Sequence, residues 1–178
     1  GSKSTAIGSG ALAAQNFTTA TDAYNTAVGF YAGIGITTGV FNTLVGGLVG
    51  DALTTGGENA AFGYAALTLD TLGSHTVAIG PYALQTQNFT TATDSFNTAV
   101  GYAAGTAVTT GRQNTLIGGL AGDALTASNS YNTAVAGAAG AAVTTGEQNT
   151  LVGALAGDAL NTSEKNVAVG YLALSAED

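Results

Sequence analysis

A short pattern of apolar and polar residues recurs along the whole chain with a period close to 17 residues. Each copy begins with Asn-Thr-Ala-Val-Gly or a near variant, so β-branched Thr and Val stand two residues apart and precede a glycine. Residues two apart share one face of a β-strand, and β-branched residues favour strands. The copies begin at Ser4, Asn25, Asn42, Asn59, Thr76, Asn97, Asn114, Asn132, Asn149 and Asn166. We number them coils 1 to 10 and count positions from the first residue of each.

The period of the repeat predicts the architecture. A unit of about 17 residues is too short for a helix pair or a propeller blade, but it suits one turn of a parallel β-solenoid with two or three short strands. Coils 1 and 5 are longer and carry nearly the same insert, Gln15–Asp22 and Gln87–Asp94, which indicates that a block of four coils was duplicated. We therefore predict an all-β fold, one continuous parallel solenoid over residues 3–178. With ten coils, its length is on the order of 50 Å.

Several positions predict the corners of the coil. Position 1 is Asn in eight of ten coils, and stacked Asn side chains form amide ladders. Position 5 is Gly in nine of ten coils, with Ala136 as the exception, which predicts a positive φ or close packing there.

Two columns of apolar residues are the expected interior. We assign position 4 to it, and position 2 on the same face, with position 12 on the opposite wall. The position 4 column is Ile7, Val28, Val45, Phe62, Ile79, Val100, Ile117, Val135, Val152 and Val169. The position 12 column includes Ile36, Leu53, Val108, Leu125, Val143 and Leu160. Asp70 interrupts this second column, and we expect Leu69 or Leu72 to replace it in the core.

Position 3 is then expected to face outward. Leu at position 3 accompanies Gly or Ala at position 6, whereas Ala at position 3 accompanies Phe or Tyr at position 6 in four coils. Such an exchange of volume is typical of two sites that pack against a common surface. The candidate subunit interface is Ala27, Phe30, Leu44, Ala61, Tyr64, Ala99, Tyr102, Leu116, Leu151 and Tyr171.

Composition supports burial against other copies and excludes some partners. Only 8% of residues are charged while 46% are hydrophobic, so little charge is available to cover a monomer's surface. With a net charge of −8 and only Lys3, Arg112 and Lys165 as strong bases, nucleic acid and anionic membrane surfaces are disfavoured. No apolar run approaches the roughly 20 residues of a transmembrane helix, so we expect no membrane insertion. We interpret Gly1-Ser2 as a tag-cleavage scar and the chain as part of a longer protein.

The repeat resembles those of two groups of fibrous proteins. Ser4-Thr-Ala-Ile-Gly, Thr76-Val-Ala-Ile-Gly and Asn166-Val-Ala-Val-Gly resemble the head repeats of trimeric autotransporter adhesins. Asn97-Thr-Ala-Val-Gly-Tyr-Ala-Ala-Gly, followed by Thr109-Thr-Gly, resembles repeats of phage and bacterial tail-fibre-domain proteins. The resemblance implies a left-handed parallel β-roll that assembles as a homotrimer outside a virion or a cell. The coils here are longer than the usual adhesin coil.

No catalytic, cofactor or metal site is predicted. The one histidine, His75, stands at a corner, and a base or ligand would need partners that nothing in the sequence brings to it. A Ca²⁺ site at Asp22 or Asp94 lacks an acidic cluster. The two inserts are the candidate recognition loops, although structural bulges fit them equally well. Their candidate residues are Phe17, Thr18, Asp22, Phe89, Thr90 and Asp94.

These observations favour a non-enzymatic role. We expect a structural or adhesive segment of a trimeric fibre, extracellular, on a phage tail fibre or a cell surface. It would act as a rigid shaft or head whose partners are its own copies and a host-surface glycan or protein receptor. One alternative is an ice-binding solenoid, motivated by Thr pairs such as Thr37-Thr38 and Thr54-Thr55, although adjacent residues on a strand point to opposite faces. The other, a glycan-degrading enzyme, would require a cluster of acids on adjacent coils.

Overall fold

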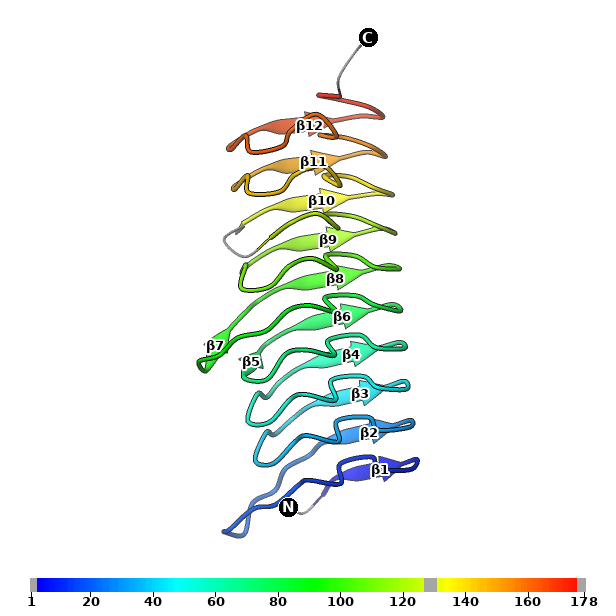
Figure 1. The fold of residues 1–178 in the computed structure, drawn as a ribbon, viewed down its shortest axis with the longest axis vertical. Helices are drawn as coiled ribbons and strands as arrows, with labels where there is room; N and C mark the ends of the chain where they lie inside the picture. Colours follow the sequence, from blue (N-terminus) through cyan, green and yellow to red (C-terminus); the bar gives the residue numbers. More distant parts are fainter. Residues whose placement is uncertain (1–2, 127–130, 176–178) are drawn as a thin grey trace.

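The computed structural model describes residues 3–126 and 131–175 and shows an all-β rod without a helix in that part of the chain (Figure 1). Gly1 and Ser2, interpreted above as a scar, lie outside the described residues. The large sheet contains the ten strands β1 (Thr5–Ile7), β2 (Thr26–Val28), β3 (Thr43–Val45), β4 (Ala60–Phe62), β6 (Val77–Ile79), β8 (Thr98–Val100), β9 (Thr115–Ile117), β10 (Thr133–Val135), β11 (Thr150–Val152) and β12 (Val167–Val169). At the end of coil 4, β5 (Gly73–Ser74) pairs in parallel with β7 (Thr93–Asp94), which belongs to the second insert.

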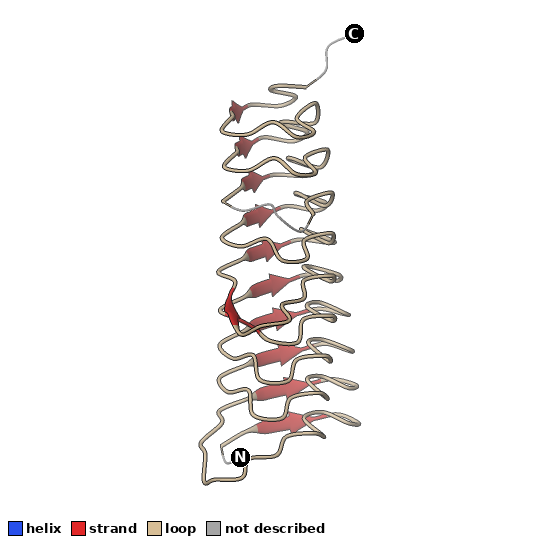
Figure 2. Ribbon diagram, turned by 60° about the vertical axis from the view of Figure 1, so that its left-hand side comes forward, coloured by secondary structure: helices blue, strands red, loops and turns tan. Residues whose placement is uncertain are grey.

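Every neighbouring pair of strands in the large sheet is parallel and in register. Thr26 aligns with Thr43, and Val28 aligns with Val45, so each repeat position stacks on the same position of the next coil. The predicted parallel β-solenoid is therefore confirmed. Each coil contributes one strand of three residues to this sheet, rather than the two or three strands expected, and the strands line one side of the rod (Figure 2).

Tight turns make up much of the rest of each coil. In coil 2, Ala32 N donates to Gly29 O (3.4 Å), Ile34 N to Tyr31 O (3.2 Å) and Ile36 N to Gly33 O (3.1 Å). The third residues of the first two turns, Tyr31 and Gly33, have φ values of 57° and 56°, the left-handed region that such turns require. Non-glycine residues are strained there and persist because the surrounding structure holds them. Stacked coils provide that support, since the same turns recur on either side.

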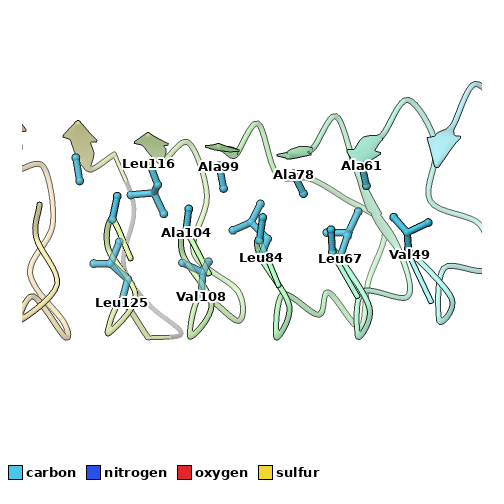
Figure 3. Packing of buried hydrophobic residues seen from close by; sticks show 14 of the residues in the cluster. Val49, Ala61, Leu67, Ala78, Leu84, Ala99, Ala104, Val108, Leu116 and Leu125 are labelled. Carbon is cyan, nitrogen blue, oxygen red and sulfur yellow. The ribbon is translucent and has the colours of Figure 1, made fainter. Parts of the chain in front are cut away.

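The side chains at positions 3, 8 and 12 form the interior of the coil (Figure 3). In coil 3 these are Leu44, Val49 and Leu53, each fully buried. The assignment of position 12 to the core is confirmed. Position 3 was expected to face outward, and that expectation was wrong. In coils 2 to 10 its side chain is at most 2% exposed.

Positions 2 and 4 face outward, which corrects the expected β-branched core. Ile79 and Ile117 are both 39% exposed, and Val169 is 70% exposed. Because successive side chains of a strand point to opposite faces, turning position 3 inward puts positions 2 and 4 outside. The coil is narrow, and Ala, the commonest residue at positions 3 and 8, fits the space between its walls. Each coil adds a larger side chain at position 9 or 12, and coils 3, 7 and 9 also have Leu at position 3.

That larger side chain comes from different positions in different coils. Six coils have an apolar residue at position 12 and Gly at position 9, whereas coils 1, 4 and 5 have Gln15, Asp70 and Gln87 at position 12 and Leu at position 9. Leu67 and Leu84, at position 9 of coils 4 and 5, are fully buried (Figure 3). The expectation that Leu69 or Leu72 replaces Asp70 in the core was therefore wrong, since Leu69 is 48% exposed and Leu72 is only half-buried.

The predicted Asn ladder is present. Oδ1 of Asn42 accepts from Asn59 N (3.1 Å) and from Asn59 Nδ2 (3.0 Å), and the same contacts join Asn25 to Asn42. Six of these amides also close their own coil, as Asn42 Nδ2 does on Gly56 O at 3.0 Å. The predicted glycine at position 5 is confirmed as well: Gly29 has a φ of 140°, and a Cβ there would lie 2.3 Å from Gly46 O.

Candidate interaction surface

The exposed apolar side chains of the chain gather on one strip of the rod. The strip consists of positions 2, 4, 6 and 7 and the residue that precedes each position 1. It contains all of the large hydrophobic residues classed as exposed among the described residues except Leu69 and Leu174. Val and Ile predominate at position 4 in its centre, and aromatic residues stand along both margins. The margin that precedes position 1 is mixed, since six of its ten residues are polar or charged: Lys3, Glu58, His75, Gln113, Gln148 and Lys165. We call this surface the apolar strip.

Aromatic rings on the margins of the apolar strip contact one another between coils. Tyr24 stacks on Phe41 with ring centroids 5.6 Å apart and planes 9° apart. On the other margin, Tyr82 meets the edges of Tyr64 and Tyr102 at 5.6 Å and 5.9 Å. Aromatic pairs add about 0.5–1.5 kcal/mol beyond the area that they bury. These ladders hold apolar rings at the surface in a fixed arrangement.

The structure divides the residues predicted to form a subunit interface. The position 6 members are 51% to 73% exposed and belong to the apolar strip; these are Phe30, Tyr64, Tyr102 and Tyr171. The position 3 members point into the coil and are at most 2% exposed; these are Ala27, Leu44, Ala61, Ala99, Leu116 and Leu151. The second group cannot contact another copy. Positions 2 and 4, which were expected in the interior, take their place on the outer face.

The two inserts end in equivalent clusters of a base, an aspartate and an aromatic ring. In the first, Lys3 Nζ lies 2.7 Å from Asp22 Oδ2 and 5.2 Å from the centre of the Tyr24 ring. In the second, His75 Nδ1 lies 3.0 Å from Asp94 Oδ1, and the imidazole lies 5.1 Å from the Phe96 ring. Partners thus converge on His75, contrary to the expectation from the sequence. Both aspartates face a basic side chain rather than a set of cation ligands.

Glu58 adds a second carboxylate to the His75 cluster, with its Oε2 3.1 Å from His75 Nε2. Both imidazole nitrogens therefore face carboxylates. All three groups are partly exposed. The arrangement ties coils 3, 4 and 5 together at the surface, and we assign it no chemistry.

The candidate recognition residues differ in accessibility. Thr18 and Thr90 are exposed, as are Asp22 and Asp94, whereas Phe17 is half-buried. Phe89 is only 4% exposed, and its N–H donates to Asp70 Oδ1 at 3.2 Å. The base of the second insert is thus anchored in the coil, and Phe89 is not presented to a partner. The exposed threonines of the second insert, such as Thr90, remain accessible to a partner.

A buried polar network lies beneath the second insert. Gln87 Nε2 donates to Asp70 Oδ2 at 2.7 Å and to Thr76 Oγ1 at 3.0 Å, while Gln87 Oε1 accepts from Asn97 Nδ2 at 2.8 Å. Burial raises the pKa of the Asp70 carboxyl, although hydrogen bonds from Gln87, Phe89 N and Gly73 N oppose this. Gln87 bridges the Asn ladder where Thr76 interrupts it. The network is enclosed within the coil, so its role is structural.

The remaining features of the surface add no further chemistry. A hollow of about 490 Å³ opens on the apolar strip, lined by Phe41, Thr43, Glu58, Asn59 and Ala60. Among residues 3–126 and 131–175, no group of three or more His, Asp or Glu is placed to hold a metal ion. The same residues include no helix long and apolar enough to cross a membrane.

Comparison with known proteins assigns no family. The chain matches no family model, no curated protein and no solved structure. Its function is therefore argued from the geometry above.

Proposed function

We propose that this chain is a structural and adhesive segment of a fibre in which copies pack side by side through the apolar strip. The observation that carries the proposal is the concentration of exposed Val, Ile, Phe and Tyr on that strip. Nine spacings of about 4.8 Å and a width of about five residues give a surface of roughly 700 Å². Stable interfaces bury about 800 Å² per partner, so the strip, with its polar residues included, is close to the size that such an interface needs.

Three copies are the number implied by the resemblance to adhesin head and tail-fibre-domain repeats. In a trimer around one axis, each apolar strip would face the strips of the other two copies. Burial of this surface is favourable by about 25 cal/mol per Å² of apolar area, before the entropic cost of association is subtracted. The low charge of the chain, 8% of its residues, is consistent with such burial.

A stiff rod on the outside of a virion or a cell would then hold the inserts away from the fibre axis. The exposed Thr18 and Thr90 are the residues of the inserts best placed to meet a glycan or protein receptor. Weak contacts repeated on three chains gain strength through effective concentration. This proposal assigns the rod to a shaft or head segment and assigns it no catalytic step.

Light scattering coupled to size exclusion tests the side-by-side contact. The unmodified chain is expected to have the mass of three copies. The double variant Ile79→Lys, Ile117→Lys places two charges in the centre of the apolar strip and is expected to run as a single chain with the same far-UV circular dichroism. Leu69→Lys is the matched control, because Leu69 is 48% exposed but lies outside the strip. A monomeric unmodified chain, or a double variant with unchanged mass, would reject the proposal.

The geometry does not favour the ice-binding alternative. The first Thr of three pairs is hydrogen-bonded within the rod: Thr37 Oγ1 donates to Thr54 O at 3.2 Å, Thr54 Oγ1 to Thr71 O at 3.0 Å and Thr144 Oγ1 to Asn161 O at 3.1 Å. Only the second Thr of each pair, such as Thr38 and Thr55, is exposed. A single interrupted column of hydroxyls remains, and a measurement of thermal hysteresis is the direct check of that alternative.

A further inference from the structure

A hollow of about 360 Å³ opens where the second insert meets one margin of the apolar strip. Thr93 and Asp94 line it from β7, the end of the insert, which stands out from the side of the rod (Figure 1). The lining from the ends of coils 5, 6 and 7 includes Phe96, Arg112, Gln113 and Tyr131. The hollow therefore combines part of a loop with side chains of three successive coils, whose spacing is fixed by the stack.

Two aromatic rings contribute apolar surface to the hollow. Phe96 and Tyr131 are both more than half exposed, and they occupy the same position two coils apart, so about 10 Å separates them along the rod. Gln113 takes this position in the coil between them. The three residues have φ values of 50°, 62° and 57°, so their backbones have the same local conformation. The column offers a ring, an amide and a second ring in succession.

The hollow also contains one acidic and one basic side chain. Asp94 Oδ1 lies 3.0 Å from His75 Nδ1, and Asp94 aligns with Ser74 in the pairing of β5 with β7, so the rod holds this carboxylate in place. The exposed Arg112 adds a planar fork of N–H donors. Because the two charges are opposite, the lining has no excess of either sign. An acidic ligand would also be repelled by the net charge of −8.

The first insert provides an internal comparison, because residues 15–22 and 87–94 have the same sequence. Phe41 takes the place of Gln113 there. Its N–H donates to Ala23 O at 2.8 Å, as the N–H of Gln113 does to Ser95 O at 2.8 Å. The two backbones thus match, but the Phe41 ring stacks on Tyr24, where the second block has an amide beside a ring.

The other partners of the hollow differ between the two blocks as well. Val40 corresponds to Arg112, and Glu58, whose carboxylate lies 3.1 Å from His75 Nε2, corresponds to Tyr131. The donor fork, the amide and the second ring accompany only the second insert. A role in folding does not require this set of side chains, since the first insert adopts its place in the rod without them. The difference indicates a ligand at the second insert.

We infer that this hollow is a binding subsite for a short neutral oligosaccharide, whose sugar rings stack on Phe96 and Tyr131. The C–H face of a sugar ring packs on an aromatic face, and its hydroxyl groups both donate and accept, which suits Asp94, Arg112 and Gln113. The inference rests on the proposed adhesive role and names a ligand class for it. In a side-by-side contact centred on position 4 of the coils, the hollow lies at the rim and stays open to solvent.

An array of immobilised neutral oligosaccharides tests the inference. The unmodified chain is expected to bind members of the array, and Phe96→Ala is expected to weaken this binding about tenfold through the loss of one stacking contact. Phe41→Ala is the matched control, because Phe41 is 51% exposed against 53% for Phe96 but lies outside this hollow, and it is expected to bind as the unmodified chain does. No binding of the unmodified chain to neutral saccharides, or an equal loss in both variants, would overturn the inference.

The double variant Arg112→Val, Gln113→Phe is a second test that does not depend on a destabilising change. It places the residues of the first block on a backbone of the same conformation, where the chain already accommodates Val40 and Phe41. Circular dichroism and the midpoint of thermal unfolding are therefore expected to stay unchanged. Titration calorimetry with the oligosaccharide that binds best on the array is expected to show no binding; unchanged affinity would overturn the inference.

Light scattering on the same samples separates this inference from the side-by-side contact. A chain with the mass of three copies that binds no neutral saccharide would overturn the inference and leave the contact supported. A single chain that binds a neutral saccharide and loses this binding in Phe96→Ala would support the inference and reject the contact.

Discussion

At the scale of single residues, the position of a side chain in the coil is decided by the space available rather than by hydrophobicity. Val and Ile at position 4 are strongly apolar, yet they lie outside, while the smaller Ala predominates at position 3 inside. The signal that could have shown this is present in the sequence. Leu at position 3 occurs only where position 9 is Gly in the same coil and in the preceding one, as for Leu44 with Gly33 and Gly50. This exchange of volume between positions 3 and 9 reflects a direct contact between the two positions.

The exchange of side-chain volume between positions 3 and 6 does not reflect a contact between these two positions. Gly47, at position 6, accommodates the neighbouring aromatic ring, since a Cβ there would lie 3.5 Å from Tyr64 Cδ2. It does not contact Leu44. In contrast, the Asn ladder and the glycine at position 5 could be predicted, because each depends on a chemical property that few residue types supply.

Asp70 provides a prediction about pH. Burial raises the pKa of its carboxyl above the ordinary value of 3.8, so between these two values the folded chain holds a proton that the unfolded chain has lost. The contribution of Asp70 to the free energy of unfolding is therefore most favourable below pH 3.8 and falls as the pH rises through the raised pKa. Denaturant unfolding of the unmodified chain and of Asp70→Asn, measured from pH 3 to pH 7, isolates this contribution. The unmodified chain is expected to lose stability relative to the variant as the pH rises; a constant difference would contradict the assignment.

At the scale of the coil, the repeat length and the corner residues were sufficient to predict a parallel solenoid. The turns were not predictable in the same way. Tyr31, Leu48 and Ala65 adopt a positive φ at position 7, where residue preferences favour glycine or asparagine. Local preference is overridden because each turn is hydrogen-bonded to its neighbours, as Tyr31 N is to Ser9 O at 2.9 Å. A prediction from one isolated coil lacks this information.

Exchange of volume within a pair of coils can be tested with a double-mutant cycle in coils 8 and 9. A Cβ at Gly140 would lie 2.9 Å from Leu151 Cδ1, and its other neighbours are at least 3.6 Å away. Leu151→Ala is expected to cost about 3 kcal/mol by leaving a cavity, and Gly140→Leu about 2 kcal/mol by overpacking. Together, the two substitutions move the leucine from position 3 to position 9, where coils 4 and 5 have it. The double variant is therefore expected to lose less stability than the sum of the two single losses, by more than about 1 kcal/mol. Additive costs in denaturant unfolding would show that the two sites do not share space.

At the scale of the whole molecule, the duplication of a four-coil block explains features that a single repeat does not. Lys3-Ser4 parallels His75-Thr76, 72 residues later in the chain. The same offset relates the Lys3 cluster to the His75 cluster. Each long coil begins with a hydroxyl residue, which interrupts the Asn ladder, and has Gln at position 12. The rod is thus a series of blocks, and each block begins with a coil that has a hydroxyl residue at position 1 and Gln at position 12.

A solenoid of this kind is coupled only through nearest neighbours, so a weakened junction divides it into two unfolding units. Gln87 is a buried side chain that joins the block of coils 1 to 4 to the coils that follow, through Asp70 and Asn97. Gln87→Leu would leave a buried carboxylate oxygen and the Asn97 amide without these partners, at about 1–3 kcal/mol each. We expect thermal unfolding followed by circular dichroism to change from one transition to two.

Gln15→Leu is the matched control for this prediction. Gln15 occupies the same position in coil 1, where its Nε2 donates to Ser4 Oγ at 3.2 Å and no described coil precedes it. Its loss is expected to lower the midpoint of unfolding without dividing the transition, because a terminal coil can fray while the rest of the stack stays folded. Hydrogen exchange locates the effect: Gln87→Leu is expected to increase exchange at the strand N–H groups of coils 4 and 5, and Gln15→Leu only in coil 1. A single transition in both variants would show that coupling across the junction rests on the apolar core around Leu67 and Leu84 instead.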